Sequence, residues 1–157
     1  EYIYSRQGYR YDLIKAALGP GVDNVYYSWR RLSALDNLKD TSRFSQLTLL
    51  AKRVNNILRD IPPYRLNSDL FQEKEEKELY SSFLIIKENV SPFIRKGDFL
   101  RAYRMVLSLQ SPINNFFDHV LVMVEDKKIR RNRLALLQQL KGLFDDLADF
   151  SQIVIEG

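Results

Sequence analysis

Basic and amide side chains recur at helical spacing in the first half of the sequence. Lys52, Asn56 and Arg59 stand at positions i, i+4 and i+7, which places them on one face of a helix, and Arg53 lies on the flank of that face. In such a row two cations can meet phosphate oxygens while the amide reads a base edge, which is the chemistry of nucleic-acid binding. The row also fits a solvated helix face whose charges only keep the protein in solution.

A second basic row lies near the end of the chain. Lys127, Arg131, Gln138 and Lys141 fall on the outer side of a predicted helix, and we interpret them as a second candidate row for phosphate contacts. The two rows could line opposite sides of one cleft if the fold brings their helices together.

Two adjacent phenylalanines, Phe116 and Phe117, precede the second row. Neighbouring side chains on a helix diverge by about 100°, so the two rings cannot face the same core direction. Either they belong to a wide core stripe, or one of them sits at a rim where an unstacked base could lie on it. We take Phe117 as the candidate rim residue.

An arginine interrupts the apolar seam of the last predicted helix. The residues that form this seam at three- and four-residue spacing are Ile129, Leu136, Leu140, Leu143, Leu147 and Phe150. The same register includes Arg133, and a buried guanidinium needs an anionic partner because an unpaired buried charge costs several kcal/mol. Asp118 on the preceding helix and Glu125 in the turn are the available carboxylates. We expect Arg133 and Asp118 to hold the last two helices together.

Composition argues against several kinds of catalytic or metal site. The chain has 157 residues, one histidine and no cysteine, which excludes disulfides, thiolate zinc sites and nitrogen-rich metal clusters and argues against a Ser-His-Asp arrangement. The only glycine-rich turn, Gly19-Pro20-Gly21, lacks the Lys-Ser or Lys-Thr of a phosphate-binding loop. We therefore predict no catalytic residues, metal or cofactor in this chain.

The distribution of charge and apolar residues indicates a soluble protein with a sided surface. The longest stretch without a charge has 13 residues, too few for a membrane span of about 20. Net charge is +5 over residues 1–66, −2 over 67–98, +5 over 99–141 and −4 over 142–157. Two basic segments separated by an acidic one suit nucleic-acid binding if the fold joins them, although helical bundles commonly carry solvated charged faces.

Few glycines and apolar spacing at three and four residues predict an all-α fold. We expect six or seven helices packed as a single bundle over residues 1–157. Their expected ranges are 9–18, 22–38, 41–61, 69–90, 99–108, 111–124 and 127–150, and Ser91-Pro92 and Gly97-Asp98 are expected to frame a short break between the fourth and the fifth. Because the chain lacks both a leader and an initiating Met, we expect it to be a fragment of a longer protein.

Several motifs in this order resemble the C-terminal part of the β subunit of bacterial glycyl-tRNA synthetase. The most specific are the eleven residues from Phe116 to Asp126, FFDHVLVMVED, followed by Arg130 and by NRLALL from Asn132 to Leu137. The others are RYDLI from Arg10, KRVNNI from Lys52, Leu70-Phe71, EKELY from Glu76 and DFS from Asp149. Together they extend over about residues 9–151.

The resemblance implies a helical anticodon-binding domain of the DALR type, a fold also found in arginyl-tRNA synthetases. It would lie at the C-terminus of a cytoplasmic β chain that works with a catalytic α subunit, usually as two copies of each. Ligation of glycine to its tRNA, with ATP and Mg²⁺, would belong to the α subunit, and no cofactor is expected in this domain.

This domain would hold the anticodon arm of glycine tRNA, whose anticodon carries two cytosines. We expect one side of the RNA-binding cleft to consist of Lys52, Arg53, Asn56 and Arg59, with Arg10 nearby. We expect the other side to consist of Lys127, Arg131 and Phe117. The alternatives are a helical protein-interaction module without RNA specificity and the related domain of an arginyl-tRNA synthetase.

Overall fold

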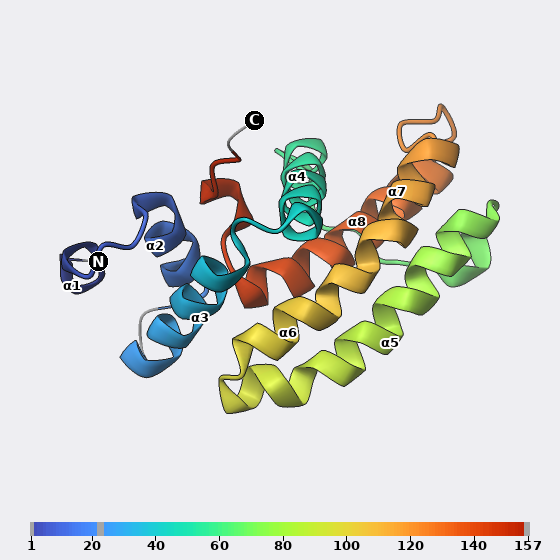
Figure 1. Cartoon of the computed structure of the whole chain (residues 1–157). Coiled ribbons are helices and arrows are strands. Elements are labelled where there is room, and N and C mark those ends of the chain that lie inside the picture. The colour runs from blue at the N-terminus through green and yellow to red at the C-terminus, as the bar shows by residue number, and fades with distance from the viewer. Residues whose placement is uncertain (1, 22–23, 156–157) are drawn as a thin grey trace.

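The computed structural model describes residues 2–21 and 24–155, and within these ranges all regular structure is helical (Figure 1). The α-helices are α1 (Tyr2–Arg6), α2 (Tyr11–Leu18), α3 (Val25–Leu38), α4 (Ser42–Ile57), α5 (Lys74–Lys96), α6 (Phe99–Val106), α7 (Gln110–His119) and α8 (Lys127–Leu147). The short 3₁₀ helices are η1 (Ser68–Leu70), η2 (Leu107–Leu109) and η3 (Phe150–Gln152). The all-α prediction is confirmed, and α1 is an additional helix that the sequence pattern did not indicate.

α4, α5 and α6 pack against α8, and α7 packs against α4 and α5. In Figure 1, α8 crosses the middle of the molecule with α4 above it. α2 and α3 contact each other at the N-terminal end, and α3 also contacts α6. The apolar seam predicted for α8 is buried along its whole length, as is the arginine within it.

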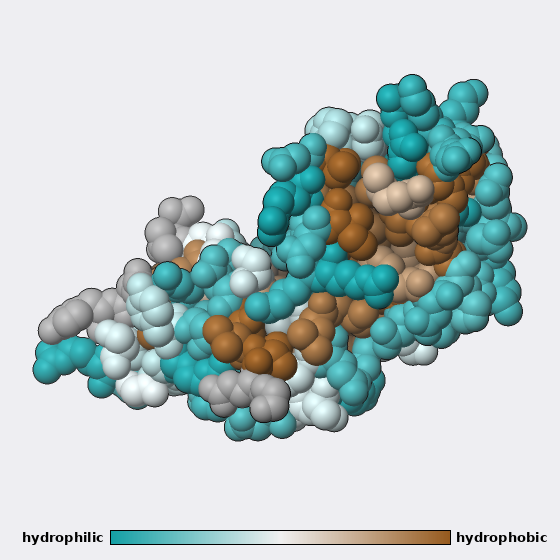
Figure 2. Space-filling model, turned by 90° about the horizontal axis from the view of Figure 1, so that it is seen from above, coloured by the Kyte–Doolittle hydropathy of each residue, from teal (hydrophilic) through white to brown (hydrophobic). Residues whose placement is uncertain are grey.

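The surface above α8 is uneven. Seen from the side of α4, the molecule is hollowed between α4 and the link that joins α7 to α8, and apolar side chains gather in this hollow (Figure 2). Hydrophilic side chains form its rim. The two predicted basic rows belong to α4 with the residues just after it, and to α8.

Large aromatic rings fill the junction of α4, α6, α8 and η3. Phe44 contacts both Tyr103 and Phe150, and Phe144 meets Phe150 edge-on with ring centroids 5.6 Å apart. The Tyr103 side chain is buried, and its hydroxyl donates a hydrogen bond to the Leu147 carbonyl at 2.7 Å. Burial raises the pKa of Tyr103 well above its ordinary value, so the hydroxyl stays protonated and keeps this bond.

The predicted break at Ser91 and Pro92 is wrong, because α5 continues through both residues to Lys96. Pro92 has no N–H to donate to the Glu88 carbonyl, so the helix loses one hydrogen bond there. α5 packs against α6 and α7, and this tertiary contact outweighs the local cost of the proline. α5 ends at Lys96, just before the Gly97-Asp98 pair at which the expected break ends. Gly97 has a φ of 75°, a left-handed conformation that suits glycine.

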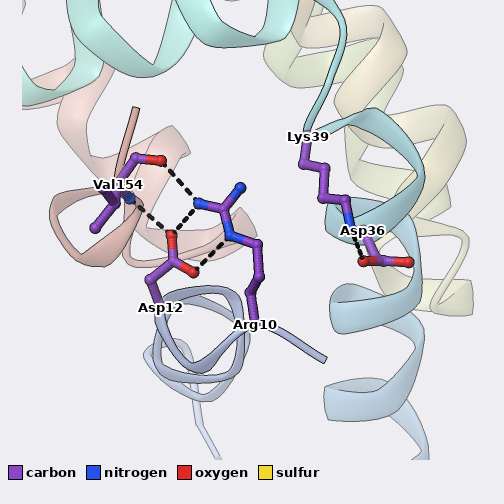
Figure 3. A network of polar contacts seen from close by, with 5 residues as sticks. All are labelled: Arg10, Asp12, Asp36, Lys39 and Val154. Atoms are coloured by element: carbon purple, nitrogen blue, oxygen red, sulfur yellow. Dashed lines mark hydrogen bonds and ion pairs between the residues drawn. The ribbon is translucent and has the colours of Figure 1, made fainter. Parts of the chain in front are cut away.

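The C-terminal segment is fastened to the start of α2 (Figure 3). Arg10 donates through Nη2 to the carboxylate of Asp12 at 2.7 Å and to the Val154 carbonyl at 2.8 Å. The Val154 N–H in turn donates to Asp12 at 2.8 Å. One turn further along α2, the Ala16 carbonyl accepts a bond from the Asp149 N–H at 2.9 Å. The bonds that reach Val154 and Asp149 join residues more than 130 positions apart in the sequence.

Replacing Asp12 by Asn should lower the free energy of unfolding by about 2 kcal/mol at pH 7, the scale of charge-assisted hydrogen bonds. Burial alone would raise the pKa of Asp12, but the hydrogen bonds from Arg10 and from the Val154 N–H lower it below its ordinary value. This stabilisation is therefore complete above the unfolded pKa of about 3.9 and is lost as pH falls through the lower folded pKa. Urea unfolding at pH 7 and pH 3 tests this, and an equal difference between D12N and wild type at both values would contradict it.

Candidate nucleic-acid interface

α4 presents the first predicted row outward because its opposite face is apolar. The apolar residues at three- and four-residue spacing along α4 and just after it are all buried, and they are Phe44, Leu47, Ala51, Val54 and Leu58. The polar residues between them are therefore turned away from α8 or to its flanks. The helix ends at Ile57, so Arg59 lies just past it, where its Nη2 donates to Oδ1 of Asn56 at 3.2 Å.

One flank of α4 faces α7, and there the structure brings together two candidate residues that were expected on opposite sides of the cleft. The Arg53 guanidinium lies over the ring of Phe117, 4.1 Å from its centroid, in a cation–π contact. Phe116 is fully buried, whereas Phe117 is half-buried at the edge of the core. The rim position expected for Phe117 is thus confirmed, and one face of its ring carries a positive charge.

The other flank of α4 borders a polar cleft of about 550 Å³. The cleft is lined by Gly19, Asn55, Asn56, Leu58, Arg59, Lys141, Asp145, Asp149 and Ser151. Lys141, a member of the second row, is paired with Asp145 at 2.5 Å. The first row is therefore split, because Arg53 faces α7 while Asn56 and Arg59 face this cleft. Lys52 is half-buried, and no hydrogen bond or ion pair to it is found among the described residues.

The first turns of α8 concentrate positive charge. Four of its first five residues are Lys127, Lys128, Arg130 and Arg131, and no acidic residue lies in the first turn. The N-cap residue Asp126, just before the helix, is acidic, and its carboxylate accepts hydrogen bonds from the N–H groups of residues 128 and 129. Cations at the positive end of a helix dipole are unfavourable by about 0.3–1 kcal/mol each. A bound polyanion would relieve this repulsion.

The four cations of this cluster differ in what they contact. Arg131 lies over the ring of Tyr64 at 5.5 Å, and Arg130 donates to the Val124 carbonyl at 3.1 Å. Lys127 and Lys128 are exposed, and within the described residues no partner engages either ammonium group. Gln138, further along the second row, holds the loop after α4 by accepting from the Tyr64 N–H at 2.9 Å. The start of α8, and not its middle, is therefore free to meet a ligand.

Arg133 is buried and paired, but the prediction that it holds the last two helices together with Asp118 is wrong, because its partner lies on α5. Its Nε donates to Glu76 on α5 at 3.0 Å, and its Nη1 donates to the Leu121 carbonyl at 2.7 Å. Both members of the ion pair are buried, whereas Asp118 is exposed. Sequence reasoning considered only carboxylates close to Arg133 in the chain, and Glu76 is 57 residues away.

Arg10 also differs from its expected place. It borders a small cleft with Phe44 and Ser45, at the first turn of α4, while the row from Lys52 to Arg59 occupies the second half of that helix and the residues after it. Its guanidinium is engaged with Asp12 and with the C-terminal segment (Figure 3). The sequence order of the motifs does not reveal that the opening helix contacts the chain end.

Comparison with known families identifies the fold. Residues 47–153 match the family model described as the DALR anticodon binding domain. This match covers about two thirds of the chain. The chain belongs to the DALR anticodon-binding domain family. The matched segment runs from α4 to η3, so it contains every candidate interface residue except Arg10.

Relatives of this DALR domain extend the similarity to almost the whole chain. Proteins named glycine–tRNA ligase beta subunit match in Moorella thermoacetica, with 37% identity over 98% of this chain, and in Sulfurihydrogenibium, with 35% identity over 98%. The protein of that name in Thermodesulfovibrio yellowstonii is 40% identical over 82%. The chain spans only 19–23% of the length of these relatives. The relatives therefore contain much more than a DALR domain.

Two residues of the DALR domain that matter for the interface were not singled out from the sequence. Tyr64, which lies under Arg131, follows Pro62-Pro63 in an irregular segment that no periodic pattern marks. Glu76 does carry a signal, because an acid at the third position of a helix is typical of a capping box. Its Oε2 accepts bonds from the N–H groups of residues 72 and 73 at 2.9 and 2.8 Å.

The described residues also carry two negative findings. None of their helices is long and apolar enough to cross a membrane. Among these same residues, no group of three or more His, Cys, Asp and Glu side chains could hold a metal ion.

Replacing Glu76 by Ala should lower the free energy of unfolding by about 3–5 kcal/mol, since it leaves the Arg133 charge buried without a partner. The double variant E76L/R133M should be much less destabilised, because it removes both charges and keeps apolar volume. Urea unfolding monitored by helical circular dichroism measures both. If E76A were as stable as the double variant, the ion pair would not hold α5 to α8.

Proposed function

We propose that this chain binds the anticodon arm of glycine tRNA as the anticodon-binding part of a glycine–tRNA ligase β subunit. The match to the DALR anticodon binding domain supports binding of an anticodon, and the name of the relatives supports glycine tRNA as the RNA that is bound. The structural observation that carries the proposal is the basic start of α8, where two lysines have no acidic partner among the described residues. In this proposal residues 1–157 act as one all-α unit.

The residues on the α7 side of α4 have distinct tasks in this interface. Lys127 and Lys128 contact phosphate oxygens at the start of α8, and Arg131 adds a third cation above Tyr64. Arg53 and Phe117 form a charged, planar surface against which an unstacked base can lie.

The polar cleft on the other flank of α4 has a second task. Asn56 and Arg59 offer an amide and a guanidinium that can read a base edge or hold a phosphate, and Lys52 adds charge nearby. Arg10 is left out of the interface that we propose, because its guanidinium fastens the C-terminal segment.

For the whole protein we propose an aminoacyl-tRNA synthetase that joins glycine to its tRNA with ATP and Mg²⁺ in the cytoplasm. The words "beta subunit" in the name of the relatives support a second kind of subunit, and we assign the catalytic step to that α subunit, with two copies of each chain. In this arrangement the chain contributes recognition and not catalysis.

Binding of glycine tRNA to this chain should weaken steeply with salt, and the K127A/K128A variant should reduce the slope of log K against log salt by about 1 for each lysine. Filter binding between 50 and 300 mM salt, roughly the range where counterion release is measurable, provides the test. The matched control is R95A/K96A, which removes two exposed cations at the far end of α5. No binding at low salt, or equal slopes for both variants, would refute phosphate contacts at α8.

A glycine tRNA whose anticodon cytosines are replaced should bind more weakly than the natural one, because base edges are read only in unstacked loops. A protein-interaction module without RNA specificity predicts equal binding of both tRNAs. The same comparison with an arginine tRNA tests the arginyl-type alternative, which predicts preference for that tRNA.

A further inference from the structure

The link between α7 and α8, residues 120–126, displays apolar side chains to solvent. The link contains a turn at residues 122–123, and within it Val120 and Val122 are buried, whereas Leu121 and Met123 are 68% and 58% exposed. The buried valines anchor the link to the core. Leu121, between the two valines, and Met123, directly after them, are therefore presented outward by a segment that is anchored to the core.

Two arginines of α8 hold the main chain of this link. Arg133 donates to the Leu121 carbonyl at 2.7 Å, and Arg130 donates to the Val124 carbonyl at 3.1 Å. Arg133 is itself fixed by its buried ion pair with Glu76. The Asp126 side chain then caps α8 and closes the link. A loop held at both ends is preorganised, so binding to it costs little conformational entropy.

The surroundings of the link favour a ligand that is both flat and anionic. Figure 2 shows an apolar hollow with a hydrophilic rim between α4 and this link. The exposed ammonium groups of Lys127 and Lys128 follow the link directly, and Arg53 on Phe117 lies on the α4 side. An unstacked nucleotide joins an apolar base face to a phosphate, and it is the ligand that matches both features.

We propose that the α7–α8 link is a base-contacting loop, in which Leu121 and Met123 lie against the face of an unstacked base of the bound RNA. The phosphates on either side of that base contact Lys127 and Lys128. Arg130, Arg133 and Glu76 are positioning residues, because they set the path of the loop without touching the base. This inference rests on the proposed function and adds a nonpolar contact site to it.

The test is binding of a glycine tRNA anticodon stem-loop to L121A/M123A across the same salt series. We expect an affinity loss of about 5- to 100-fold, the range for losing a contact with one base face, with an unchanged salt slope because no charge is removed. The control L84A/I85A removes two apolar side chains of α5 that are 46% and 58% exposed, and it should bind like wild type. M123L keeps an apolar surface and should retain most of the affinity.

A second arm identifies the base contact itself. An abasic site is placed at each loop nucleotide of the stem-loop in turn. At the contacted nucleotide, wild type and L121A/M123A should bind the abasic stem-loop equally, because the base that the two side chains contact is missing. The position at which the difference disappears therefore identifies the contacted base. All variants alter exposed positions, and equal thermal unfolding midpoints confirm that they fold.

The outcomes separate the two proposals. If K127A/K128A flattens the salt slope while L121A/M123A binds like wild type, the base-contacting loop is refuted and the proposed function stands. Equal losses in L121A/M123A and L84A/I85A, or no abasic position that removes the difference, would also refute it. If wild type binds no glycine tRNA at low salt, both proposals fail together.

Discussion

The buried ion pair between Arg133 and Glu76 is the interaction on which the arrangement of the interface depends. Each charge would be costly alone in the core, and each is satisfied more than once. Glu76 also accepts two N–H groups at the start of α5, and Arg133 also donates to a carbonyl of the α7–α8 link. One contact thus sets the register of α5 against α8 and the path of the link between α7 and α8.

α8 combines two demands that conflict in an isolated helix. Its apolar seam and Arg133 bury it among α4, α5 and α6, which fixes its position. Its first turns carry four cations where the helix dipole favours anions. Tertiary packing supplies the stability that the charge pattern reduces, and this is typical of sites where a local rule is broken for binding. The basic first turns of α8 lie within the segment that matches the DALR family, residues 47–153.

The parts of the structure that follow local periodicity could be predicted from the sequence. The stripe of α4 and the seam of α8 are buried as their spacing indicates, because one face of each helix is apolar. The partner of Arg133 could not be found, since ion pairs across 57 residues leave no spacing signal. Pro92 misled the helix assignment because the cost of a proline is local while the packing of α5 is not. Arg53 and Phe117 were each expected at the cleft, but only the fold shows that they touch.

The hydrogen bonds between the C-terminal segment and α2 connect the end of the chain to residues near its start. The family-matched segment begins at residue 47 and includes Asp149, yet the Ala16 carbonyl that accepts from the Asp149 N–H precedes it. Asp12, which accepts from the Val154 N–H just past the matched segment, precedes it as well. η3 also packs on α2. A polypeptide trimmed to the matched residues would lose the first five residues of α4 and also α2, on which its own last turns rest. The last turns of the family-matched segment therefore rest partly on α2, a helix that lies before the first matched residue.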